Sequence, residues 1–227
     1  MKKAFVTFGA VILAGIFLIL AVRCFISFNR SVSVRGLCER EVKADVAIYP
    51  ISFRESGNDL ISLYNNVSKK NQIILDFLES NGISEDEITI GVPVVTDRQS
   101  EGYYQGGLER YTLKSTVTVY TKQVDNVLAL QRNLSTLIEK GIALSADDWS
   151  NPITYQFASL NEIKPEMIQE ANQNARQAAD QFAKDSKSRV GKIKNAEQGL
   201  FSIENRDINT PYIKKVRVVT YVTYQLK

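Results

Sequence analysis

The sequence predicts an α+β protein, a mostly antiparallel sheet with amphipathic helices packed on one face, in the order ββα ββα βα ββ. Three observations support this prediction. Apolar residues recur at spacings of three and four in three stretches, which is typical of helices with one buried face. Elsewhere apolar and polar residues alternate, as they do in half-buried strands. Glycines and turn-forming residues separate the two kinds of pattern.

The longest predicted helix covers residues 165–190 and is rich in alanine. Pro165 suits a first helical turn, where its missing N–H costs nothing, and Gly191 suits the left-handed position at which helices end. Small alanines allow a helix to lie close to a sheet, and Phe182 would anchor that contact. The spacing predicts that four residues share the buried face: Ala171, Ala175, Ala178 and Phe182.

The other elements are predicted from the same patterns. Two strands are expected at 32–38 and 45–54, and Pro50 indicates an edge or a bulge in the second. An amphipathic helix is expected over 57–82, with Asn58 as its N-cap and Gly82 just past its end. The chain then continues through a strand at 88–94, a loop at 97–107, a strand at 111–119, a helix at 124–138, a strand within 148–159 and, after the Ala-rich helix, two strands joined by a turn at 204–211.

Several stretches together resemble one known family. They read VRGLCEREVKADVA (34–47), LNEIKPEMI (160–168), ARQAADQFAKDSKSRVGKIKNAEQGLFSI (175–203) and NTPYIKKVRVV (209–219). From about Val32 to the C-terminus the chain resembles the SIMPL-domain family, which includes bacterial periplasmic immunogenic proteins and a protein linked to oxidative stress defence. The resemblance implies a domain outside the cytoplasm, a loose link to envelope or oxidative stress, and homo-oligomerisation. It supplies no catalytic residues that transfer to this chain.

Residues 1–30 are predicted to form an N-terminal signal anchor, and residues 31–227 the SIMPL-like domain. An apolar run from Ala4 to Val22 follows two lysines. As a helix these residues span roughly 28 Å, close to the hydrocarbon thickness of a bilayer. The sequence therefore predicts one transmembrane helix over 4–22.

The residues that follow this run favour an anchor that is not cleaved. No pair of small residues stands at the spacing that signal peptidase requires. Cys24 leaves lipidation open as an alternative, although Arg23 precedes it where a small residue is needed. We expect a single-pass protein of the inner (cytoplasmic) membrane, with its soluble domain in the periplasm or at the cell exterior.

Composition excludes several classes of chemistry. The 227 residues contain no histidine, which excludes Ser-His-Asp and Cys-His catalysis and histidine metal sites. Beyond the first thirty residues the chain has 24 basic and 25 acidic residues, so it is not a polyanion binder by bulk charge, and we expect no nucleic-acid partner. Cys38 is interpreted as a small buried hydrophobe, with a redox-sensing thiol as the alternative. No cofactor, metal or enzymatic activity is expected.

Two groups of residues are candidates for contact with partners. Tyr103 and Tyr104 lie in the polar 97–107 loop, where they either pack back on the sheet or contact a partner or another subunit. The second group is basic and either complements a helix dipole or contacts an anionic surface such as lipid headgroups: Lys184, Lys187, Arg189, Lys192 and Lys194.

These observations predict a membrane-anchored, non-enzymatic interaction or assembly module outside the cytoplasm. Its protein partner is not indicated by the sequence. The alternative is a membrane-tethered binder of a small envelope ligand, held in a cleft between helices and sheet. The alternative requires an apolar pocket with a few convergent polar groups.

Overall fold

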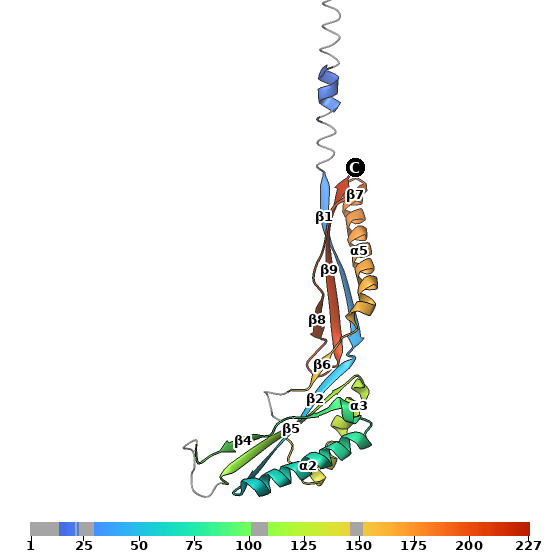
Figure 1. Ribbon diagram of the computed structural model, residues 1–227. Coiled ribbons are helices and arrows are strands. Elements are labelled where there is room, and N and C mark those ends of the chain that lie inside the picture. The colour runs from blue at the N-terminus through green and yellow to red at the C-terminus, as the bar shows by residue number, and fades with distance from the viewer. Residues whose placement is uncertain (1–13, 21, 23–29, 101–108, 146–151) are drawn as a thin grey trace, which may run out of the picture. The chain divides into compact units, whose positions relative to one another are not determined.

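The computed structural model describes residues 14–20, 22, 30–100, 109–145 and 152–227 (Figure 1). The chain divides into two compact units. Unit 1 comprises Met1–Glu41, Leu160–Glu204 and Lys215–Lys227, and unit 2 comprises Val42–Ser159 and Asn205–Lys214. Each unit contains one antiparallel sheet and at least one long helix, so the predicted α+β class is confirmed, with two sheets instead of one.

The sheet of unit 1 has the strand order β1-β9-β7, and β8 also pairs with β9. Burial alternates along β1 and β9, so one face of this sheet is covered and the other is exposed. Helix α5 covers the buried face (Figure 1). The elements are β1 (Ser31–Lys43), α5 (Leu160–Asp185), β7 (Val190–Gln198), β8 (Ser202–Asn205) and β9 (Ile213–Leu226).

The predicted alanine contact between α5 and the sheet is confirmed, but its register is different. The fully buried row advances by four residues at each step and consists of Met167, Ala171, Ala175, Ala179 and Ala183. Phe182 was expected to anchor the contact, yet it is 60% exposed. A row at every fourth residue drifts slowly around the helix, and this drift leaves Phe182 on the solvent side.

The boundaries of α5 also differ from the prediction. The helix starts at Leu160, so Pro165 lies inside it and removes only its own N–H from the ladder. It ends at Asp185, and the left-handed residue after it is Lys187, with φ 53°. Gly191 belongs to β7 instead, where a Cβ would lie 3.1 Å from the carbonyl oxygen of Gln225.

The sheet of unit 2 has the order β3-β5-β2-β6, with β4 also paired to β5. Its centre is the long antiparallel pair β2–β5, in register from Ala47↔Thr121 to Gly57↔Tyr111. Helices α2, α3 and α4 pack on the face that carries Phe53, Leu113 and Val117. The elements are β2 (Val46–Gly57), α2 (Leu60–Ser80), the 3-10 turn η1 (Glu85–Glu87), β3 (Ile88–Ile90), β4 (Val94–Asp97), β5 (Tyr111–Thr121), α3 (Val124–Arg132), α4 (Ser135–Glu139) and β6 (Thr154–Gln156).

Several details of unit 2 correct the prediction. The N-cap of α2 is Asp59, whose Oδ1 accepts the N–H of Ser62 at 2.7 Å. Asn58 instead accepts the backbone N–H of Arg110 at 2.9 Å. The strand expected at 88–94 is two short strands separated by the segment that holds Pro93, and the helix expected at 124–138 is divided into α3 and α4. Gly82 follows α2 with φ +83°, as predicted.

The N-terminal segment is described only in part. Residues 14–20 and 22 are helical, and the rest of the 4–22 run lies outside the described residues. In the described parts of the chain, no helix combines the length and the apolar character needed to cross a membrane. The transmembrane helix over 4–22 stays a prediction.

Candidate functional site

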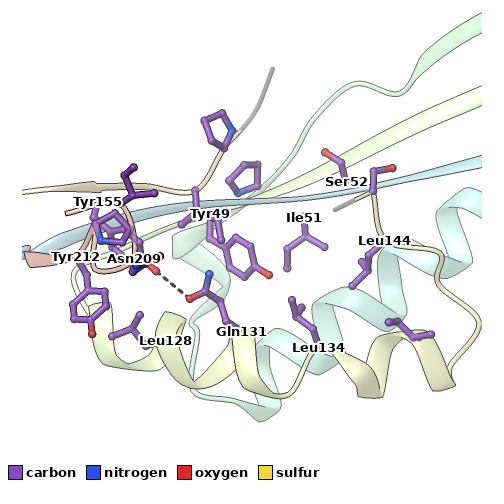
Figure 2. A pocket seen from close by; sticks show the side chains of 17 residues that line it. Tyr49, Ile51, Ser52, Leu128, Gln131, Leu134, Leu144, Tyr155, Asn209 and Tyr212 are labelled. Atoms are coloured by element: carbon purple, nitrogen blue, oxygen red, sulfur yellow. Dashed lines mark hydrogen bonds between the residues drawn. The ribbon is translucent and has the colours of Figure 1, made fainter. Parts of the chain in front are cut away.

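A pocket of about 960 Å³ opens in unit 2, between β2 and the helices α3 and α4 (Figure 2). One wall is the edge of β2, the opposite wall is formed by α3 and α4, and the turn before β9 closes one end. The structure describes 17 residues that line the pocket, and every one of these is uncharged. They are Tyr49, Pro50, Ile51, Ser52, Leu128, Gln131, Leu134, Ile138, Leu144, Ser145, Pro152, Ile153, Tyr155, Ile208, Asn209, Pro211 and Tyr212.

The pocket lies along a stretch of β2 that, among the described residues, has no strand partner on one side. β6 pairs with β2 only over Val46–Ile48, and the next contact on that side is the bridge of Phe53 with Leu144. Pro50 stands between these two contacts and has no N–H to offer a neighbouring strand. Strand β2 thus lies between β5 and β6 in the sheet, and the edge predicted at Pro50 is seen only as a local gap in pairing on this side, among the described residues, while β5 pairs continuously along the other side.

Three tyrosines bring polar groups into this apolar space. The hydroxyl of Tyr155 donates to Oε1 of Gln131 at 3.2 Å. The rings of Tyr155 and Tyr212 meet edge to face, with centroids 6.1 Å apart and planes at 72°. Tyr49 extends from β2 into the pocket and is only 5% exposed (Figure 2). Among the described residues, its hydroxyl has no hydrogen-bond partner.

The phenols of Tyr49 and Tyr155 stay neutral at physiological pH. Burial, followed by the nearby Tyr155 phenol, raises the pKa of Tyr49 to about 12. Burial also raises the pKa of Tyr155, with Tyr212 as a second cause. The polar side chains that the structure describes in the pocket are hydroxyls and amides, which bind through hydrogen bonds and not through charge.

The turn that closes one end of the pocket is organised by Asp207. Its Oδ1 accepts the backbone N–H of Asn209 at 2.8 Å and of Thr210 at 2.7 Å. Its Oδ2 accepts the Thr210 hydroxyl, and also the Nε of Arg206 at 3.0 Å. The hydroxyl of Thr210 and the Arg206 guanidinium lower the pKa of Asp207 to about 2. This carboxylate fixes the turn that presents Ile208 and Asn209 to the pocket.

The predicted basic residues are all exposed, and the structure adds two further cations near three of them. Lys184 is in the last turn of α5, and Lys187 and Arg189 follow the helix. The backbones of Arg189 and Lys227 exchange two hydrogen bonds, at 2.9 and 2.8 Å. Arg30 donates from Nη2 to the hydroxyl of Ser188 at 2.7 Å. We call these five residues the basic end of unit 1: Arg30, Lys184, Lys187, Arg189 and Lys227.

The remaining sequence candidates fall elsewhere. Lys192 and Lys194 lie on β7, beyond the basic end. Tyr103 and Tyr104 lie outside the described residues. Cys38 is 1% exposed, and burial followed by Glu170 raises the pKa of its thiol, which fits the interpretation of a small buried side chain.

The pocket residues were missed by sequence reasoning because they come from five separate segments of the chain. Pro50 was the available signal, since a proline inside a strand pattern marks an open edge. A second signal was the turn sequence RDINTPY (206–212), in which an aspartate, an asparagine and a proline precede an aromatic residue. Neither signal identifies the opposite wall on α3 and α4.

Fold and pocket together define an α+β protein built on two one-sided antiparallel sheets, one of which carries a cavity whose described lining is uncharged and mostly apolar. A family model described as SIMPL, a protein of unknown function (DUF541), matches residues 32–218. The match covers well over half of the chain, so this protein belongs to the SIMPL family. Among curated proteins, no sequence matches this chain.

Proposed function

We propose that this SIMPL protein is held in the inner membrane by its N-terminal segment and binds a small ligand in the pocket of unit 2, outside the cytoplasm. The observation that carries this proposal is the pocket itself. Its volume, about 960 Å³, falls within the range of pockets that enclose small molecules, and its few polar groups converge on an apolar interior. This is the geometry that the ligand-binding alternative required.

The composition of the pocket supports binding without covalent chemistry. Among the residues that the structure describes, the lining includes no acid, lysine, arginine or cysteine. General acid–base and nucleophilic catalysis use such groups at a reactive centre, with pKa values near the working pH. The pKa of the Tyr49 phenol, at about 12, is far from neutrality. These groups support our proposal of a non-enzymatic role.

Two features support the membrane tether. The apolar run Ala4–Val22 is long enough to span a bilayer as a helix. Arg30 follows that run by eight residues and belongs to the basic end of unit 1, a group of exposed cations that favours anionic headgroups. The extracytoplasmic side and the link to envelope or oxidative stress come from the family resemblance and are part of the proposal.

The tether and the ligand are tested separately. The full-length chain should remain with the membrane after alkaline carbonate washing and should float with vesicles, whereas a variant without residues 4–22 should not. Recovery of the full-length chain in the soluble fraction would contradict the tether.

For the ligand, the protein is purified from its own membranes into nanodiscs and denatured, and the released small molecules are identified by mass spectrometry. Leu134→Trp fills the pocket and should release less of any specific molecule than the wild type. Ile61→Trp is the matched control, because Ile61 is 74% exposed on α2 and does not line the pocket. Equal profiles from the wild type and Leu134→Trp would contradict ligand binding.

One observation also favours the assembly role. β4 pairs only with β5 among the described strands, and its Val94 and Val95 are 61% and 48% exposed. An exposed apolar edge strand is a template for pairing with another chain. A lysine at Val95 blocks such pairing, so Val95→Lys should lower the mass measured by light scattering if copies assemble through β4. An unchanged mass would remove this edge from consideration.

A further inference from the structure

We propose that the ligand of the unit 2 pocket is an uncharged, mainly hydrocarbon molecule with one hydrogen-bonding oxygen or nitrogen that pairs with the hydroxyl of Tyr49. This inference rests on the proposed binding function and names the chemical class of the ligand. It is carried by two observations on the pocket: the charge of its lining and the state of its buried polar groups.

The described part of the lining offers a charged ligand no counter-charge. A charged group that leaves water loses several kcal/mol of hydration, and a protein offsets this loss with a counter-charge or a metal. The 17 lining residues that the structure describes are all uncharged. An ion would therefore enter this space without a counter-charge from these residues. A neutral molecule would instead displace water from the side chains of Ile51, Leu128 and Leu134, which is favourable in free energy.

The polar groups point to a single anchoring hydrogen bond. The Tyr155 hydroxyl is already bonded to Gln131, and the Ser52 hydroxyl lies 2.9 Å from that of Thr116. Tyr49 differs, because the residue is 95% buried while its hydroxyl has no partner among the described residues. Among the described residues the only fully buried polar side-chain atom without a hydrogen-bond partner is Oγ1 of Thr220, so the Tyr49 hydroxyl is accessible from the cavity and can bond to a molecule bound there.

Three probes of one shape separate the parts of this inference: indane, 1-indanone and indane-1-carboxylate. Indane is hydrocarbon alone, 1-indanone adds a carbonyl acceptor, and the carboxylate adds a charge. Each is measured by equilibrium dialysis against the full-length protein in lipid nanodiscs, with binding to empty nanodiscs subtracted. We expect 1-indanone to bind about 3- to 10-fold more tightly than indane, as one net hydrogen bond provides. We expect no measurable binding of the carboxylate.

Two tyrosine variants assign the hydrogen bond. Tyr49→Phe removes one oxygen and keeps the ring, so it should reduce the preference for 1-indanone over indane to none while indane binds as before. Tyr120→Phe is the control, because Tyr120 is 55% exposed on β5 and lies outside the pocket. Thermal melting of both variants shows whether they fold, and hydrogen exchange of residues 45–54 locates the bound probe.

The outcomes distinguish this inference from the function on which it rests. Binding of indane and 1-indanone with equal affinity, or a preference that survives Tyr49→Phe, overturns the role of Tyr49. Binding of the carboxylate as tightly as 1-indanone overturns the neutral ligand class. If no probe binds the wild type and exchange of residues 45–54 is unaffected, the pocket is not a ligand site and the proposed function itself fails.

Discussion

A Cβ atom on Gly36 of β1 would lie 1.8 Å from the carbonyl oxygen of Ala171 in α5. The same atom would be 2.7 Å from the backbone N of Ala175. The backbones of strand and helix are therefore in direct contact, with no side chain between them. This contact explains why the buried row of α5 consists mostly of alanine and why β1 has a glycine inside an otherwise regular strand.

Gly36→Ala should destabilise unit 1 by about 1–3 kcal/mol or more, the cost of forcing an additional methyl group into a packed contact. The obstruction is helix backbone, which cannot rotate away as a side chain can. Urea unfolding followed by circular dichroism measures the change. Gly57→Ala is the control, because the nearest atom to a Cβ there is Cδ1 of Leu63 at 3.6 Å, an ordinary contact. Equal stabilities for the two variants would contradict the close approach of β1 and α5.

Met167→Ala and Phe182→Ala test which face of α5 is buried. Met167 is fully buried, and its truncation should cost about 2–5 kcal/mol in the free energy of unfolding. Phe182 is 60% exposed, and its truncation should change stability by less than about 1 kcal/mol. Chemical denaturation of both variants gives the comparison. A larger loss for Phe182→Ala would restore the face that the sequence pattern predicted.

The predicted and observed buried faces of α5 show what the spacing of apolar residues can and cannot predict. The spacing of the alanines alone predicts that a helix exists and that its alanine-rich face contacts the sheet, because the apolar face of a helix is normally buried. The choice between Ala178 with Phe182 and Ala179 with Ala183 depends on how close the backbones come. A phenylalanine cannot enter a contact that leaves no room for a methyl group on Gly36, and that information lies in β1, far away in sequence.

Lys187→Gly should stabilise the protein by about 1 kcal/mol, because Lys187 adopts φ 53°, a left-handed conformation that costs a residue with a Cβ about that much. The residue stands two positions after the last residue of α5, where glycine is the common helix terminator. Thermal melting measures the gain. Lys184→Gly removes the same charge inside the last helical turn and should lower stability by a similar amount. Two changes of the same sign would show that charge, and not backbone conformation, decides the result.

The pocket was less predictable than the fold because, like the buried face of α5, it depends on segments that are far apart in the sequence. Each strand and helix that lines it is signalled locally, and the open edge is signalled by Pro50. Among the described residues β6 is only three residues long, and Tyr49–Ile51 have no strand partner on that side of β2. The length of a strand partner is set by tertiary pairing, and patterns in β2 alone do not contain it.

Ligand affinity of the pocket should decrease at acid pH, because the Asp207 carboxylate orders the turn beside it. The folded-state pKa of Asp207 is lowered from 3.8 to about 2, so its carboxylate stabilises the turn fully above about pH 4. This stabilisation is lost as the pH falls through about 2, where the carboxyl is protonated in the folded state as well. Hydrogen exchange of residues 205–212 and the affinity for 1-indanone should both be measured between pH 5 and pH 2. Protection of the turn and binding of 1-indanone should decrease together as the pH falls.

Asp207→Asn removes the titrating group behind this acid dependence. The variant should be less protected at pH 5, because the amide cannot pair with Arg206, and its protection should vary little down to pH 2. Asp86→Asn, an exposed change in η1, should keep the wild-type pH profile. A decrease in Asp207→Asn as steep as in the wild type would assign the acid sensitivity to another group. Because the turn carries Ile208 and Asn209 into the pocket, the same comparison measures how far ligand affinity depends on an ordered turn.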